Sequence, residues 1–230
     1  MTTRTYQGMR LRSPSSLITG VSASITVRKG ELSEEPEAAS VAWVGLSTAN
    51  EVAGTPTWWL QFGHVYRKME VADLQRKFDR SRPGSDTYLQ AQPDDRAKPR
   101  TGHYLYVEGA KEGTTLKRTL LPGKAYKYRI EQGRDGWDYF LNEKKLCTIQ
   151  PPDLFKNKEL VVMFMCEELG GSSIPGSMSE KTIFTECEYE YSAEWIDADF
   201  DSEEFIPQIL NRNQKSHWTS AGNSLSVWSD

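Results

Sequence analysis

The sequence has few of the residues that build metal sites, disulfide frameworks or membrane spans. Its 230 residues include three cysteines and three histidines, and neither set has the spacing of metal ligands. The longest apolar run, LVVMFMC at 160–166, has the length of a strand and is far short of the ~20 residues that cross a bilayer. The sequence therefore predicts no metal, no cofactor and no membrane span, and we expect three free thiols.

An excess of charge of one sign is also lacking. The chain has 28 Lys and Arg against 32 Asp and Glu, scattered along its length, for a formal net charge of −4. Because no basic stripe is present, we expect no nucleic-acid partner. The N-terminal residues lack the continuous apolar segment of a secretory signal, which predicts a cytoplasmic location, or a secreted one if a signal has been removed.

Aromatic residues and short alternating segments are abundant instead, with 7 Trp and 10 Tyr. Segments that alternate apolar and polar residues with the period of a strand are 18–27, 39–46, 57–66, 103–109, 124–132, 137–142, 159–167 and 182–196. Turn signals rich in Gly and Pro, such as LLPGK, QGRDG and GGSSIPGS, separate them. This pattern predicts an all-β fold, an antiparallel two-sheet β-sandwich or jelly roll.

Helical spacing is found only over 68–80, where Val71, Leu74 and Phe78 fall on one stripe. This short helix begins a polar stretch, about 68–102, which we expect to form a surface insertion.

The chain length is ordinary for one β-sandwich, so residues 1–230 are predicted to form a single domain. The tail 211–230 is rich in Ser and Asn but keeps Trp218 and Trp228. We therefore expect the tail to pack on the domain.

The segment 182–196 has carboxylates on one face. Read as one strand, it places Cys187 and Tyr189 on the interior face. The opposite face then carries Glu186, Glu188, Glu190 and Glu194. Successive carboxylates would lie ~6.6 Å apart, so repulsion would raise some of their pKa values, as a proton donor requires. The plain alternative is a solvated face, which acids line to stay hydrated.

The stretch WWLQFGH contains a polar side chain in an aromatic setting. Alternation places Gln61 on the same face as Trp59 and Gly63. Glutamine in such a place is a satisfied core amide, a rim residue, or a group that orients a water or an oxyanion.

The motifs GVSASITV, SVAWVGL, WLQFG, YLYVEG and SAEWI, in this order, resemble those of the glutamic peptidases, also called eqolisins. The resemblance implies a concanavalin A-like β-sandwich and an acid endopeptidase activity in which a glutamine and a glutamate activate water. It matches Trp43 to the cleft tryptophan and Gln61 to the catalytic glutamine. It also matches Glu108 to a glutamate of the middle strand, and Glu194 to the first glutamate of the last motif.

The chain departs from the family pattern at the residue that matters most. The family's catalytic glutamate falls on Ala198, and a methyl group can neither accept a proton from water nor give one to a leaving amine. Ser47 stands where the family has an aspartate. Asp197 would replace the missing acid only if a bulge turned it to the other face.

Two hypotheses follow from the resemblance, so enzymatic activity is left open. In the first, Trp43, Gln61, Glu108 and Glu194 line a groove that binds an extended peptide, and catalysis is impaired. In the second, the protein is an active acid endopeptidase, in which Gln61 acts with Glu194 or Asp197 on a directly attacking water.

A third hypothesis is a glycan-binding, lectin-like or purely structural β-sandwich. Exposed aromatic rings such as Trp59 and Tyr106 would then stack on sugars. The predicted ligand is accordingly an extended peptide or a glycan.

Overall fold

The computed structural model describes residues 4–35, 38–48, 59–69, 100–109, 112–150, 158–210 and 216–230. These residues form fifteen strands. The strands are β1 Arg4–Leu11, β2 Ile18–Thr26, β3 Ala39–Thr48, β4 Trp59–Met69, β5 Arg100–Gly109, β6 Glu112–Thr119, β7 Ala125–Gln132, β8 Trp137–Leu141, β9 Lys144–Ile149, β10 Leu160–Leu169, β11 Thr182–Tyr191, β12 Glu194–Asp197, β13 Phe205–Leu210, β14 Ser216–Ala221 and β15 Ser224–Ser229.

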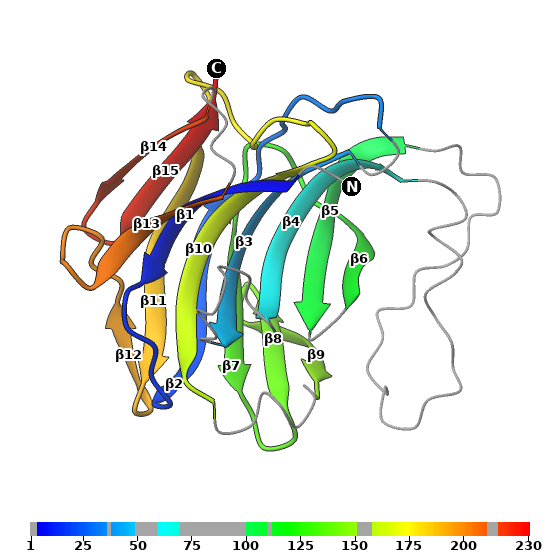
Figure 1. Cartoon of the computed structure of the whole chain (residues 1–230). Helices are drawn as coiled ribbons and strands as arrows, with labels where there is room; N and C mark the ends of the chain where they lie inside the picture. Colours follow the sequence, from blue (N-terminus) through cyan, green and yellow to red (C-terminus); the bar gives the residue numbers. More distant parts are fainter. Residues whose placement is uncertain are drawn as a thin grey trace.

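The strands are arranged in two sheets that pack face to face (Figure 1). The seven-stranded sheet has the order β13-β1-β10-β3-β4-β5-β6, and the eight-stranded sheet has the order β14-β15-β11-β2-β7-β8-β9, with β12 added beside β11. The strand pairs are antiparallel. The predicted all-β, two-sheet sandwich is therefore confirmed, and no described residue is helical.

The core lies between the sheets and is built from the inward side chains of both. Phe62 of β4 packs edge-on against Tyr128 of β7 and Tyr139 of β8, with ring centroids 5.1 and 5.4 Å apart. From the eight-stranded sheet, Val21 and Phe184 are fully buried. Burial alternates along β8, as the alternating sequence predicts, whereas β3 of the seven-stranded sheet is buried at every residue.

Strand β11 departs from the predicted alternation at a bulge. The register with β2 shifts between Thr185 and Glu188, and Glu186 has a φ of 50°. Phe184 is therefore buried and Thr185 exposed, the reverse of the prediction. Beyond the bulge the prediction holds, because Cys187 is buried as expected.

Several strands have too little alternation to be predicted, among them β1, β13 and the C-terminal hairpin of β14 and β15. The C-terminal hairpin packs on the domain: β15 pairs with β11 of the eight-stranded sheet, and the partly buried Trp218 packs against the core. The helix predicted over 68–80 lies almost wholly outside the described residues, and its first two residues belong to β4. In the described part of the chain, no helix has the length and apolar character of a membrane span.

The three cysteines are free thiols in the structure. Cys166 and Cys187 are buried and Cys147 is half-buried, and burial raises the pKa of the Cys147 thiol to about 11. We expect a thiol titration of the denatured, unreduced protein to count three groups, and the native protein to react slowly. A count of one in denaturant would contradict this, because it would reveal a disulfide.

Candidate functional site

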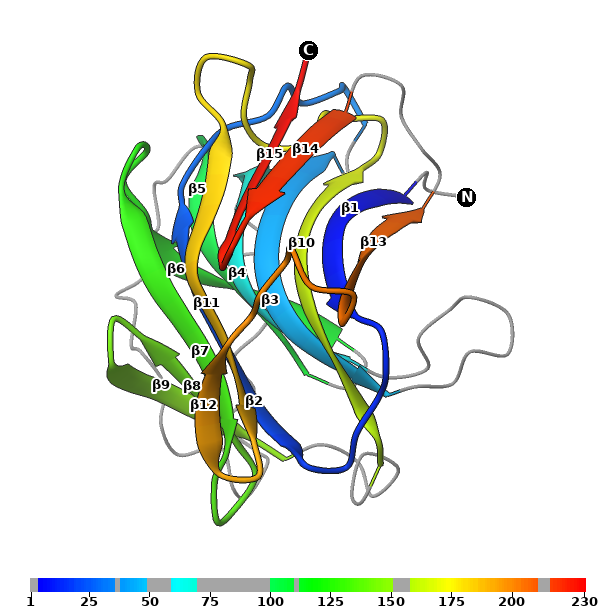
Figure 2. The same ribbon diagram turned by 90° about the vertical axis from the view of Figure 1, so that its left-hand side faces the viewer.

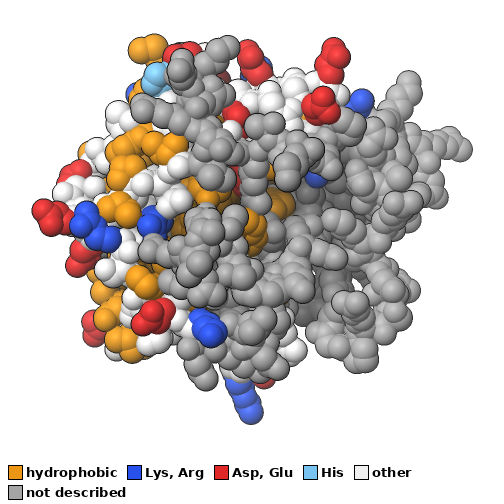
Figure 3. Space-filling model, in the orientation of Figure 1, with side chains coloured by type: hydrophobic (Ala, Val, Ile, Leu, Met, Phe, Trp, Pro, Cys, Tyr) orange, Lys and Arg blue, Asp and Glu red, His pale blue; other side chains and the backbone are white. Residues whose placement is uncertain are grey.

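The candidate site lies on the outer face of the seven-stranded sheet. Because Phe62 points at the eight-stranded sheet, alternation along β4 turns Gln61 and Gly63 to the opposite side. Figure 2 shows that the strands of this sheet bend around that side, which makes it concave. In the space-filling view from this side (Figure 3), hydrophobic side chains are visible on the described surface.

The strand register brings most of the predicted site residues onto this face. Gln61 is paired with Gly45 on β3 and with Glu108 on β5. One step along, Gly63 is paired with Trp43 and with Tyr106, and directly paired residues share a face. Trp59, two residues before Gln61, lies on the same face and is half-buried. The strand positions of these residues therefore agree with one shared surface on the outer face of the seven-stranded sheet.

Gln61 is fully buried and its side-chain amide is unsatisfied. Neither its Oε1 nor its Nε2 has a hydrogen-bond partner among the residues that the structure describes. An unmade hydrogen bond of a buried amide costs about 1–3 kcal/mol for each polar atom. Such a cost points to a group that is satisfied by something outside the folded chain.

The Trp43 ring is fixed beside Gln61 by a buried carboxylate that the sequence analysis missed. Trp43 Nε1 donates to Glu167 Oε2 at 3.2 Å, and both residues are 2% exposed. Glu167 ends the apolar run of β10, and alternation from Met163 places it on the outer face. The signal was available, since a glutamate that closes a fully buried strand must have a partner.

The residue that faces Gln61 across β3 is apolar. Gly45 is paired with Met163 on β10, so Met163, Gly45 and Gln61 form one row across the sheet. Glu167 lies four residues from Met163 along β10, which is ~13 Å at the rise of a strand. On the other side of Gln61 the same row continues to Glu108 of β5.

Glu194 is not brought to Gln61, which corrects the expectation that the two share a groove. Ser192 and Ala193 have positive φ values of 53° and 65° and form a two-residue hairpin turn. Beyond this turn, β12 runs back along β11 of the eight-stranded sheet, whereas Gln61 belongs to the other sheet. The predicted single strand 182–196 is therefore two strands, and Glu194 is exposed.

Asp197, considered as a replacement for the missing acid, and Ala198, the position of that acid, lie next to Glu194 in the chain. Asp197 is exposed at the end of β12 and accepts a hydrogen bond from Asn223 Nδ2 at 3.1 Å. Ala198 is fully buried, and its N–H donates to the carbonyl of Cys187 on β11 at 2.8 Å. Both positions therefore belong to the eight-stranded sheet.

Two histidines lie between the sheets, behind the candidate site. His64 is fully buried with Nδ1 at 3.4 Å from the Tyr128 hydroxyl, and burial and then the charge of His103 lower its pKa to about 3. His103 is 5% exposed, and burial and then the charge of Lys29 lower its pKa to about 4. Both rings are neutral at pH 7, and His64 Nε2 and His103 Nδ1 have no partner among the described residues.

Gly45 is required by the position of the Trp43 ring. A Cβ added at Gly45 would lie 2.6 Å from the Leu60 carbonyl and 2.9 Å from Trp43 Cζ3. We expect Gly45→Ala to lower the free energy of unfolding by about 2 kcal/mol and to change the near-ultraviolet circular dichroism of the tryptophans. Gly102→Ala is the control, because its added Cβ would come no closer than 3.4 Å to other atoms. Equal stability of the two variants would contradict the assignment.

Comparisons with known proteins support the fold. The structure is similar to scytalido-glutamic peptidase bound to a transition-state analogue inhibitor, with a TM-score of 0.60 and 16% identity over all of both chains. It is also similar to SCP-B, a member of the eqolisin family, in complex with the tripeptide Ala-Ile-His, with a TM-score of 0.53 and 15% identity over all of both chains. No protein-family model matches the chain, and no curated protein is similar to it in sequence. At this identity the likeness shows a shared β-sandwich fold alone.

Proposed function

We propose that this glutamic-peptidase-like β-sandwich binds an extended peptide on the outer face of its seven-stranded sheet and is impaired in cleaving it. The observation that carries the proposal is the buried, unsatisfied amide of Gln61, whose strand partner Gly45 lies against the Trp43 ring. A peptide backbone supplies both the N–H donor and the C=O acceptor that this amide lacks.

The surroundings of Gln61 suit a peptide laid across the strands. Gly45 and Gly63 carry no side chains next to Gln61, and the Trp43 ring packs against Gly45. Met163, Trp43 and Tyr106 surround this strip with large side chains that pack on apolar residues. A bound tripeptide in the similar SCP-B structure is in keeping with such a ligand.

Impaired catalysis is inferred from the β10 side of the row that contains Gln61. A water held by the amide needs a second group to take its proton, and the β10 position across Gly45 is Met163. A thioether accepts no proton at any pH at which the protein is folded, and the Glu167 carboxylate is already engaged by Trp43. The Gln61 amide can still form hydrogen bonds with a peptide, because these bonds need no proton acceptor at the Met163 position.

The test is peptide binding by the full chain at neutral pH. We expect a fluorescent library of unstructured hexapeptides to contain members that bind saturably, and Gln61→Leu to weaken them at least tenfold. Gln132→Leu is the matched control, because Gln132 is exposed on the eight-stranded sheet. The proposal would be refuted if the two variants bound peptides equally well, or if the unmodified chain bound none.

One observation favours an active peptidase as the second candidate. Glu108 is the residue directly paired with Gln61 in the register of β4 and β5, and Cβ atoms of such pairs are about 5 Å apart. If cleavage of a denatured protein substrate is found, we expect it to disappear in both Gln61→Leu and Glu108→Gln and to persist in Glu194→Gln. Loss in Glu194→Gln instead would mean that the exposed hairpin supplies the acid.

A further inference from the structure

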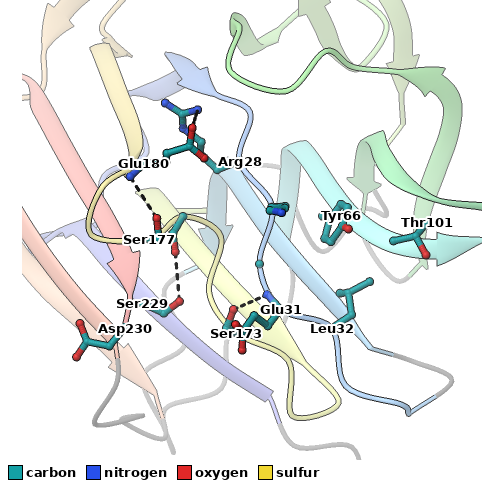
Figure 4. A pocket seen from close by; sticks show the side chains of 13 residues that line it. Arg28, Glu31, Leu32, Tyr66, Thr101, Ser173, Ser177, Glu180, Ser229 and Asp230 are labelled. Atoms are coloured by element: carbon teal, nitrogen blue, oxygen red, sulfur yellow. Dashed lines mark hydrogen bonds and ion pairs between the residues drawn. The ribbon is translucent and has the colours of Figure 1, made fainter.

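A pocket of about 460 Å³ lies at one open end of the space between the two sheets (Figure 4). The loop after β2, the loop between β10 and β11, and the end of β15 meet there over Tyr66 of β4. Tyr66 is on the same side of β4 as Phe62, so the pocket is distinct from the outer face that carries Gln61. Its volume is in the range of sites that hold small molecules.

Most charged groups of this pocket are engaged within the protein. Arg28 Nη1 is 3.6 Å from Glu180 Oε1, and Arg28 Nε donates to the carbonyl of Lys181 at 3.2 Å. Asp230 Oδ2 is 2.8 Å from His217 Nε2. These pairs hold the loops and the end of β15 in place, and they leave little charge for a ligand.

Two opposite charges remain without a partner among the described residues. Lys29 and Glu31 both line the pocket, both are exposed, and neither forms an ion pair within that part of the chain. Their backbone is held against the loop between β10 and β11. Gly176 N–H donates to the Lys29 carbonyl at 3.0 Å, and Ser173 N–H donates to the Glu31 carbonyl at 2.8 Å.

Lys29 and Glu31 are two residues apart in the loop after β2, so one small ligand in the pocket can meet both charges. An extended peptide of two residues spans about 7 Å between its ends. A zwitterionic dipeptide is therefore short enough to meet both charges within this one pocket.

We propose that this pocket binds a short zwitterionic peptide of about two residues. Lys29 pairs with its terminal carboxylate and Glu31 with its terminal ammonium. Tyr66 and Leu32 provide the apolar wall for one side chain of the ligand. This site is independent of the peptide-binding face around Gln61, because its residues belong to the loops at the end of the sandwich.

The experiment is a titration of the isotope-labelled full chain with glycyl-phenylalanine, followed by backbone amide NMR at pH 7. We expect saturable shifts at Lys29–Leu32 and Ser173–Ser177. The doubly blocked ligand, acetyl-glycyl-phenylalanine amide, should bind at least tenfold more weakly. Lys29→Gln and Glu31→Gln should each weaken the free dipeptide at least fivefold, whereas Lys144→Gln, an exposed lysine of β9, should leave it unchanged.

Three results would overturn the proposal. They are an absence of saturable shifts, equal binding of the blocked and free dipeptides, and shifts confined to Trp43, Gly45 and Val65. The third result would instead place the dipeptide on the outer face of the seven-stranded sheet. That outcome would support the proposed peptide-binding face while refuting the pocket, so failures of the two proposals are distinguishable.

Discussion

Acidification from pH 7 to about pH 4 is expected to lower the free energy of unfolding by about 5 kcal/mol through His64 and His103 alone. Both imidazoles are neutral in the core, with pKa values lowered to about 3 and about 4. In the unfolded chain each has the ordinary pKa of about 6.5. A loss of this size is comparable to the whole stability of many domains.

The sign follows from proton binding. Between about pH 6.5 and pH 4 the unfolded chain binds protons at these two histidines and the folded chain does not, so acid favours unfolding. The stability that the neutral rings provide is present in full above pH 6.5, and it is lost as the pH falls toward the folded-state pKa values. No acceptor among the described residues faces His64 Nε2 or His103 Nδ1, so an N–H formed there on protonation would have no hydrogen-bond partner in the folded state.

Urea unfolding at several pH values between 7 and 4 measures this effect. The double variant His64→Leu with His103→Leu should have a much flatter dependence of stability on pH, whatever its stability at pH 7. His217→Asn is the control, because His217 is an exposed histidine paired with Asp230. An unchanged pH dependence in the double variant would show that other groups are responsible.

This acid lability bears on the proposed function. The resemblance to glutamic peptidases implies catalysis at acidic pH, where the carboxyl of the pair is protonated. A sandwich whose core holds two unprotonated histidines loses stability over that same range. We therefore expect the proposed peptide binding to be strongest near neutral pH, where both imidazoles are uncharged and the fold is more stable.

The sequence was sufficient for the fold because alternation reports burial directly. It also placed Trp59 and Gln61 on one face, since β4 pairs with β3 and β5 without a bulge. Trp43 joined them because β3 is paired with β4 without a bulge, as its continuous register shows. Local patterning therefore predicts a site wherever the strands that carry it are regular.

The predicted position of Glu194 was wrong because it depends on backbone conformations that the sequence does not indicate. Glu186, Ser192 and Ala193 all have positive φ although none is a glycine, and such residues give no turn signal. The turn at Ser192 and Ala193 moves Glu194 away from the sheet of Gln61. Glu167 was missed for another reason, since its contact with Trp43 joins residues 124 positions apart.

Ala198→Glu restores the acid that the resemblance finds missing, and we expect it to unfold or strongly destabilise the protein without creating a peptidase. Ala198 is fully buried, and its backbone is held to Cys187 by a hydrogen bond. A carboxylate placed there would lie within the hydrophobic core cluster that contains Ala198 and Phe200. Burying an unpaired charge is expected to cost about 3–5 kcal/mol.

Ile196→Glu is the matched control, because Ile196 is 38% exposed on β12 and a new carboxylate there stays in water. We expect it to change the free energy of unfolding by less than about 1 kcal/mol. Urea unfolding of both variants, and cleavage of a denatured protein substrate between about pH 3 and pH 7, give the two readouts. A stable Ala198→Glu variant with peptidase activity that Gln61→Leu abolishes would contradict the placement of Ala198 on the eight-stranded sheet. It would mean that the loop after β12 reaches the Gln61 face, and the impaired catalysis would then have a single cause, the methyl group at position 198.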